Sequence, residues 1–386
     1  MKSVRISFST GVFLLLSSWI FLPWGEFKIN RVARGAVFSV FDLLPLFLWL
    51  AGIITIILMI LLVRNRKHLF DSVVSWAVCF VPVGALLLLG GYRPVEVLID
   101  SAVARISIGA GFYFLFIGTM LILSQTKYAG LKNLLVILSI VVAISTGALN
   151  ELGLVKEYRN ISGIFSAELN RHIVLALSSA LAAIIPGVLM GYAGMRYPKI
   201  KEWVFGFVHV FQVAPTLSLL ALMMIPLATL SRAFPFLAQL GIKGIGFAPA
   251  FIVLFLYSLL PITVNTYAGL MQTDPAVLES ALALGMTQRQ RFRKIWFPLS
   301  LPSIFAGIRT AMTQNIGNTI LAGLVGGGGM GALIFLGLSQ SALDLVLLGT
   351  IPVVVMALGV DAFFAWVEAT TVKKLGVDYD PNQAAN

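Results

Sequence analysis

The chain has 386 residues, of which 59% are hydrophobic and 11% are charged, and its formal net charge is +11. One soluble core of this size could not bury that much apolar surface, so the composition excludes an ordinary soluble protein and predicts one that lives in lipid. The basic residues are scattered through loops and do not gather on one face, which excludes nucleic acid as the partner of this charge.

Apolar runs close to the roughly 20 residues that cross the hydrocarbon layer recur along the whole sequence. We therefore predict an all-α polytopic membrane protein with about ten transmembrane helices. The predicted spans lie near residues 9–23, 43–63, 73–91, 106–124, 131–150, 172–194, 203–226, 247–270, 303–325 and 345–367.

The spans fall into two sets of five, divided by a polar stretch. Residues 1–150 form an N-terminal membrane extension of about five helices. Its sequence is compatible with packing around the second set and with regulation, and does not choose between them. Residues 151–171 form an extracytoplasmic connector, and residues 172–370 hold the second set of spans. A polar loop at 274–302 interrupts this second set, and residues 371–386 form a tail.

Basic residues in the loops predict the orientation of these spans. Alternate loops sort into two sets, one with sixteen lysines and arginines and one with ten. The richer set faces the cytoplasm under the positive-inside rule. Both termini and the 274–302 loop are therefore predicted to be cytoplasmic.

The 274–302 loop carries signals for two short helices joined at a glycine. Asp274 can cap a first helix with Pro275 at its first position, and Gly285 suits the left-handed position that ends it. Thr287 and Gln290 then have the spacing of a capping box for a second, basic helix. A soluble partner could dock on such a loop.

The same loop resembles the EAA motif of ABC importer permeases, which is commonly written Glu-Ala-Ala, three residues, Gly, nine residues, Ile-x-Leu-Pro. Two positions depart from that pattern, Ser280 for the second alanine and Phe297 for the leucine. The resemblance implies a five-helix permease core at 172–370 and a loop that couples it to an ATPase. The coupling residues that it implies are Glu279, Ser280, Ala281, Gly285, Ile295 and Pro298.

Membership of that family would also imply the partners of this chain. They are ABC ATPase subunits that bind ATP-Mg, a second permease subunit that is a copy or a homologue, an extracytoplasmic substrate-binding protein and membrane lipid. The sequence contains no GxxxxGK[ST] motif, so it cannot supply a P-loop for its own nucleotide, and any ATP use must come from a partner. We expect no cofactor in this chain and ATP hydrolysis in the partner ATPase, so that this chain is not itself an enzyme. The implied location is the bacterial cytoplasmic (inner) membrane.

Longer stretches narrow the resemblance to permeases of osmoprotectant importers, which carry glycine betaine, choline, carnitine or related quaternary amines. Permeases of amino-acid importers, such as the methionine type, share the core and are the alternative. The stretches that carry the narrower resemblance are 211–219, 259–267, 306–310 and 325–331.

Polar residues inside the second set of spans suggest a translocation pathway. Gln314, Asn315, Asn318 and Thr319 lie at helical spacing on one face, where they either line a pathway or bond to neighbouring helices. Asp361 is costly in hydrocarbon unless it is paired, and Arg309 is its expected partner by depth. A secondary carrier driven by ions would need such a group, and remains a third alternative.

Several other features point to structure and not to chemistry. The run 326–331 matches the GxGxxG pattern, but it follows a predicted membrane helix and not a strand, so we interpret it as a bend or a close approach of backbone. Cys79 is expected to be a small core residue and His172 to make hydrogen bonds. We find no residues with catalytic or metal-ligating spacing.

Overall fold

The computed structural model describes residues 2–65, 74–92 and 104–375, so the end of the predicted tail lies outside the described residues. The chain divides into two compact units. The first, which we call the N-terminal unit, holds Met1–Ser162 and Gly337–Leu345. The second, which we call the core unit, holds Gly163–Leu336 and Val346–Asn386.

The N-terminal unit is helical with one small sheet. Its elements in chain order are α1 (Lys2–Ile20), β1 (Gly25–Lys28), β2 (Ala36–Phe38), α2 (Val40–Leu43), α3 (Leu46–Asn65), α5 (Ser75–Val78), α6 (Val81–Gly91), β3 (Arg105–Ile108), α7 (Ala110–Ser124) and α8 (Ala129–Ser145).

The three strands form an antiparallel sheet in the order β2-β1-β3. Gly25 of β1 lies opposite Phe38 on one side and Ile108 on the other. The sequence did not predict this sheet, because strands of three or four residues are too short for alternation to stand out. The chain is otherwise mostly helical, as predicted.

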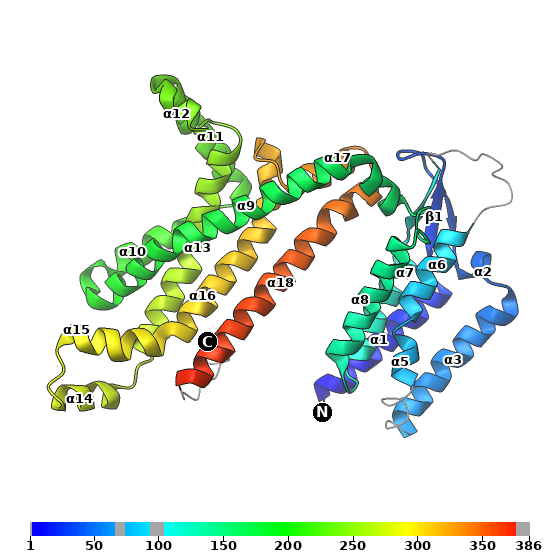
Figure 1. Cartoon of the computed structure of the whole chain (residues 1–386), viewed down its shortest axis with the longest axis horizontal. Coiled ribbons are helices and arrows are strands. Elements are labelled where there is room, and N and C mark those ends of the chain that lie inside the picture. Colours follow the sequence, from blue (N-terminus) through cyan, green and yellow to red (C-terminus); the bar gives the residue numbers. More distant parts are fainter. Residues whose placement is uncertain (1, 66–73, 93–103, 376–386) are drawn as a thin grey trace. The chain divides into compact units, whose positions relative to one another are not determined.

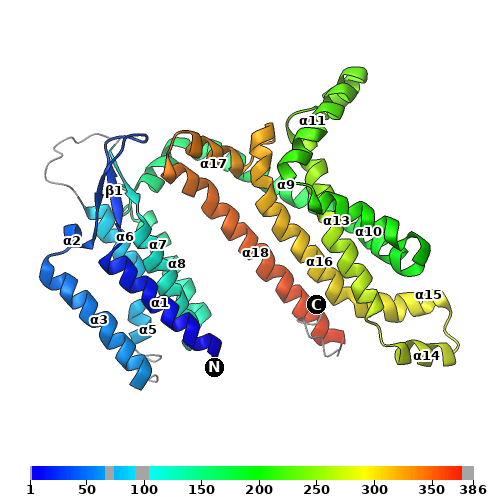
Figure 2. The ribbon, with the colours of Figure 1, turned by 180° about the vertical axis from the view of Figure 1, so that it is seen from behind.

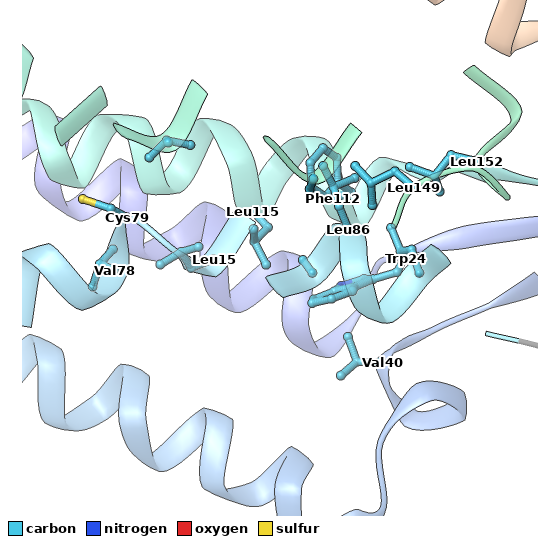
Figure 3. Close-up of a cluster of buried hydrophobic side chains, with 14 of the residues drawn as sticks. Leu15, Trp24, Val40, Val78, Cys79, Leu86, Phe112, Leu115, Leu149 and Leu152 are labelled. Atoms are coloured by element: carbon cyan, nitrogen blue, oxygen red, sulfur yellow. The ribbon is translucent and has the colours of Figure 1, made fainter. Parts of the chain in front are cut away.

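Aliphatic and aromatic side chains from several helices fill the centre of the N-terminal unit. Leu15 of α1, Leu86 of α6 and Leu115 of α7 are buried together with Trp24. Figure 3 shows this cluster, which also contains Cys79. The prediction that Cys79 is a core residue is therefore confirmed.

The core unit is built almost wholly from helices. Its elements are α9 (Gly153–Arg196, which begins in the N-terminal unit), α10 (Pro198–Val213), α11 (Thr216–Ala233), α12 (Pro235–Gln239), α13 (Phe247–Met271), α14 (Pro275–Ala283), α15 (Gln288–Arg291), a π-helical turn (Phe292–Trp296), α16 (Phe297–Asn318), a 3₁₀ helix (Thr319–Val325), α17 (Met330–Ser339) and α18 (Leu343–Leu375).

Helices α13 and α16 pack along each other at the centre of this unit (Figures 1 and 2). Gly307 of α16 makes this possible, since a Cβ there would come within 2.7 Å of the Pro261 carbonyl oxygen. Ile262 and Ala311 are fully buried in the cluster that results. The α14–α15 loop lies at one end of α13 and α16, and α17 lies at the other.

The structure does not confirm the number of ten spans. Among the described residues, the four helices α9, α11, α13 and α18 are long and apolar enough to cross a membrane. The pair Gln288–Val325 and Met330–Ser339, bent by 60°, would make a fifth. Apolar helices of 10–17 residues occupy the places of the first five predicted spans.

One predicted span differs from the structure. The span predicted at 203–226 is wrong, because the chain breaks between α10 and α11 at Ala214 and Pro215. Proline lacks an N–H and forces the preceding residue into an extended conformation, and Ala214 has φ −68° and ψ 132°. The predicted connector 151–171 is mostly helical and forms the start of α9, which has a kink at Ile161.

Candidate functional site

The loop that joins α13 to α16 has the local structure that its sequence predicts. The Asp274 carboxylate accepts the Ala276 N–H at 2.8 Å and caps α14, with Pro275 at its first position. At the other end, the Gly285 N–H bonds to the Leu282 carbonyl at 2.9 Å, and the next N–H bonds to the Ala281 carbonyl at 3.1 Å. This pair of bonds is a Schellman motif, which needs a left-handed residue, and Gly285 has φ +74°.

A reciprocal capping box starts the second half of the loop. The Gln290 N–H donates to the Thr287 hydroxyl at 3.4 Å, and the Thr287 N–H donates to the Gln290 side-chain oxygen at 2.8 Å. Helix α15 then passes through the π-helical turn Phe292–Trp296 directly into α16. The loop is therefore a firmly capped structure that is continuous with a central helix of the core unit.

The surface of this loop is partly apolar. Val277, Leu282 and Leu284 are exposed, the last to 81%. Exposed apolar side chains of this kind, gathered on one short polar segment, are typical of a protein interaction site. The Glu279 side chain is exposed on the same segment, and so are Arg289, Arg293 and Lys294.

The expected coupling residues contribute to this surface in different ways. Glu279 is exposed, but Ala281 is only 3% exposed and packs inward. The Ser280 hydroxyl donates to the Ala276 carbonyl of its own helix at 2.8 Å. Ile295 lies in the π-helical turn and Pro298 at the start of α16, both half-buried. Ala281 thus shapes the loop from inside, whereas Glu279 and Ser280 are both exposed.

The four residues of the polar patch on α16 differ in burial and in hydrogen bonding. The sequence left open whether they line a pathway or bond to neighbouring helices. Asn315 is buried and donates from Nδ2 to the Ser179 hydroxyl of α9 at 2.9 Å. The Thr319 hydroxyl donates to the Asn315 carbonyl at 2.6 Å. Gln314 is exposed and Asn318 is half-buried. The Asn315 side chain therefore bonds to a neighbouring helix and the Thr319 hydroxyl bonds within its own helix, whereas Gln314 and Asn318 are the less buried members of the patch.

The predicted pairing of Arg309 with Asp361 is confirmed. Arg309 donates from Nε and Nη2 to the two carboxylate oxygens of Asp361, at 2.6 and 2.8 Å. Nη1 of Arg309 lies 3.7 Å from a Glu368 carboxylate oxygen, which the sequence did not predict. The guanidinium therefore joins α16 to α18 in bidentate geometry.

The glycine run at 326–331 forms a tight turn that is held by α9. Gly326, Gly328 and Gly329 all have positive φ. The Gly329 N–H donates to Oε2 of Glu168 at 2.6 Å, and the Met330 N–H lies 3.2 Å from Nδ1 of His172. We call this segment, residues 326–331, the glycine turn. A 3₁₀ helix and not a strand precedes it, which agrees with our rejection of a dinucleotide site.

His172 holds two segments of the core unit at once. Its Nδ1 accepts the Met330 N–H, so its proton is on Nε2, which donates to the Ile316 carbonyl at 2.9 Å. The predicted hydrogen bonding of His172 is confirmed. The sequence did not predict the partners of His172 or the role of Glu168. The only sequence signal for them is that Glu168 and His172 lie one turn apart on the same helix.

Two family models match the sequence, one in each half. The model described as "Binding-protein-dependent transport system inner membrane component" matches residues 183–373. The model described as "ABC transporter permease YehY, N-terminal domain" matches residues 4–155. The N-terminal extension therefore has its own counterpart among ABC permeases, which its sequence alone did not reveal.

Known permeases are similar to about half of this chain. The choline transport system permease protein OpuBD of Bacillus subtilis is 37% identical over 202 residues, which are 52% of this chain and 82% of that one. The glycine betaine/carnitine/choline permease OpuCD of the same organism is 35% identical, over 55% of this chain and 86% of that one. The osmoprotectant import permease OsmW of Salmonella typhimurium is 35% identical, over 50% and 84%.

Among solved structures, the chain is similar to inward-facing MetNI, a methionine ABC transporter, with 17% identity and a TM-score of 0.47 over 55% of this chain and 98% of that one. That likeness is too weak to carry an argument. The matches to family models and to permeases of known type, together with the capped loop, lead to one conclusion. This chain belongs to the family of ABC importer permeases, the inner membrane components of binding-protein-dependent transport systems.

Proposed function

We propose that this chain forms the membrane pathway of an ATP-driven importer for choline, glycine betaine, carnitine or related quaternary amines. The observation that carries the substrate class is the 35–37% identity to permeases of these compounds over most of their length. A separate binding protein delivers the amine, and a second permease subunit completes the pathway. Gln314 and Asn318 face that pathway, since they are the members of the α16 patch that remain open.

A separate ATPase drives this transport through the 274–302 loop. Exposed Val277, Leu282 and Leu284 supply the apolar part of the docking surface, and the Glu279 carboxylate supplies a charge for basic groups of the ATPase. Because the π-helical turn continues into α16, movement of the loop passes directly to the helix that carries the polar patch. ATP binding and hydrolysis then switch the pathway between outward and inward opening.

The Arg309–Asp361 pair favours this mechanism over an ion-driven carrier. Such a carrier needs an ionisable group that takes up and releases an ion. Asp361 is instead held by two hydrogen bonds from a guanidinium that keeps its charge. Uptake should therefore need the ATPase and survive collapse of the proton gradient.

Replacement of Gly285 by leucine tests the coupling. No atom lies within 4 Å of a Cβ at Gly285, so the variant folds, but it strains the left-handed turn and fills the docking surface. We expect uptake of labelled choline, glycine betaine and carnitine to fall at least about tenfold, with the amount of protein in the membrane unchanged.

Gly241 offers a matched control for this experiment. It also has positive φ, +82°, and no atom within 4 Å of its Cβ, but it lies between α12 and α13. Gly241→Leu carries the same backbone strain outside the docking surface, so it should retain uptake. Equal uptake by Gly285→Leu and Gly241→Leu would contradict the coupling role of the loop. Uptake of methionine and of none of the three amines would show that the chain belongs to an amino-acid importer.

The same proposal places the loop and both termini in the cytoplasm of a bacterial cell. Cys79 is buried, so a single cysteine introduced at the exposed Glu279 would be the reactive one among the described residues. It should react with an impermeant maleimide in inverted vesicles and not in intact cells. Reaction in intact cells would show that the loop faces the outside of the cell and that the proposed orientation is wrong.

A further inference from the structure

One short segment of the permease sequence is part of the N-terminal unit. Residues Gly337–Leu345 lie within the stretch 183–373 that matches the permease family, yet they cluster with Met1–Ser162. Helix α17 ends and helix α18 begins inside this segment. We call residues 337–345 the anchored turn.

Asp344 attaches the anchored turn to the sheet of the N-terminal unit. The Ser107 hydroxyl of β3 donates to Oδ2 of Asp344 at 2.6 Å. Asp344 is 5% exposed and Ser107 is 3% exposed. A Cβ at Gly153 would come within 2.1 Å of Oδ2, so this carboxylate also packs directly on the first residue of α9. A buried carboxylate bound in this way is costly to release.

Arg31 makes a second attachment at the other side of the turn. Its Nη1 donates to the Gln340 side-chain oxygen at 3.2 Å, and its Nε donates to Oε1 of Glu157 at 2.7 Å. The bonds to Glu157 raise the pKa of the Arg31 guanidinium above its usual value, so Arg31 stays charged. Glu157 is fully buried and pairs with Arg105 of β3 as well.

The strand β3 therefore supports both attachments. It provides Ser107 directly, and it provides Arg105 to the carboxylate that holds Arg31. Ser107 in turn lies opposite Glu26 of β1 in the ladder. The Ser107 bond therefore fixes the anchored turn to a hydrogen-bonded sheet, while Arg31 reaches the turn from the connection between β1 and β2.

The two helices that meet in the anchored turn lead to two hydrogen-bonded contacts of the core unit. Helix α17 starts at Met330, whose N–H donates to Nδ1 of His172, and α18 continues to Asp361 and its bond to Arg309. Both helices therefore pass from the anchored turn, which belongs to the N-terminal unit, into the core unit.

We propose that the N-terminal unit is the fixed support of the transport cycle, and that it acts through the Ser107–Asp344 bond to the anchored turn. This proposal rests on the proposed function and assigns a role to the extension. Without the bond, part of the movement that ATP hydrolysis produces displaces the turn and no longer opens the pathway.

Ser107→Ala tests this role, with Ser18→Ala as its matched control. The Ser18 hydroxyl is also fully buried in the N-terminal unit, and it donates to the Gly111 carbonyl at 2.7 Å, but it does not touch the anchored turn. Each variant is reconstituted in vesicles with its ATPase and binding protein. The measurements are hydrogen exchange of residues 337–345 and the amount of labelled choline, glycine betaine or carnitine imported per ATP hydrolysed.

We expect exchange of the anchored turn to rise about tenfold in Ser107→Ala and import per ATP to fall several-fold, with both near wild type in Ser18→Ala. Faster exchange with unchanged or higher import per ATP overturns the proposal, and so does equal behaviour of the two variants. If Ser107→Ala does not accumulate, it is replaced by Gln340→Ala, which removes the bond to Arg31. Import per ATP equal to that of the wild type in Gln340→Ala would then overturn the proposal.

Failure of the proposed function is visible separately. If the wild-type complex imports none of the three amines, the substrate class is wrong. The support role is then read from the factor by which the binding protein stimulates ATP hydrolysis. That factor has to be lower in Ser107→Ala than in Ser18→Ala, and equal factors overturn the proposal.

Discussion

Two glycine-dependent turns of the core unit have similar backbones and opposite surroundings. Gly285 has φ +74°, and Gly326, Gly328 and Gly329 lie between +72° and +84°. A Cβ at Gly285 meets nothing within 4 Å, whereas one at Gly328 would lie 2.8 Å from a Glu168 carboxylate oxygen. Conformation alone requires glycine in the coupling loop, while conformation and packing both require it in the glycine turn. The first turn is open to a partner, and the second is already covered by its own chain.

The largest expected effect comes from the crowded turn. A Cβ at Gly331 would lie 1.8 Å from the Ile320 carbonyl oxygen, which is backbone and cannot rotate away. Gly331→Ala should therefore destabilise the fold by about 3 kcal/mol. The midpoint of thermal unfolding of the purified protein measures this loss.

Gly317 provides the control for that loss. It is helical, and nothing lies within 4 Å of its Cβ. Gly317→Ala should leave the midpoint unchanged or raise it, because alanine favours a helix by up to about 1 kcal/mol over glycine. Equal midpoints for the two variants would show that crowding at Gly331 does not stabilise the fold through the glycine turn.

The comparison also explains which parts of the site could be predicted. The caps Asp274 and Thr287 and the left-handed Gly285 follow from rules that connect residues within one or two turns of a helix. The pairing of Arg309 with Asp361 followed from the cost of charge at membrane depth. These features depend on local geometry or on one strong energy term.

The features that were missed depend on contacts between distant segments. Glu168 meets Gly329 across 161 residues, and Ser107 meets Asp344 across 237. No spacing in the sequence connects such pairs, and hydrophobic periodicity carries no information on them. The break between α10 and α11 is a different case. Pro215 is a sequence signal for such a break, but we gave more weight to the continuous apolar run around it.

An intermediate effect is expected from the acceptor that covers the glycine turn. Glu168→Ala removes the carboxylate that accepts the Gly329 N–H at 2.6 Å, a charged hydrogen bond of about 1.5–3 kcal/mol. Hydrogen exchange of residues 326–331 should rise accordingly. Glu202→Ala removes an exposed carboxylate of α10 and should leave that exchange unchanged. An unchanged glycine turn in both variants would mean that packing alone holds it.

The smallest effect is expected from the cap of the open loop. Thr287→Ala removes the hydroxyl that accepts the Gln290 N–H, at a cost of about 1 kcal/mol, so exchange of residues 288–291 should rise about fivefold. Thr310→Ala is the control, since its hydroxyl bonds within α16 and caps nothing. Because the loop is open on its outer side, the loss should stay local and leave the thermal midpoint unchanged. A lowered midpoint in Thr287→Ala would instead mean that the coupling loop is as much a part of the packed core as the glycine turn, and the contrast between the two turns would then be wrong.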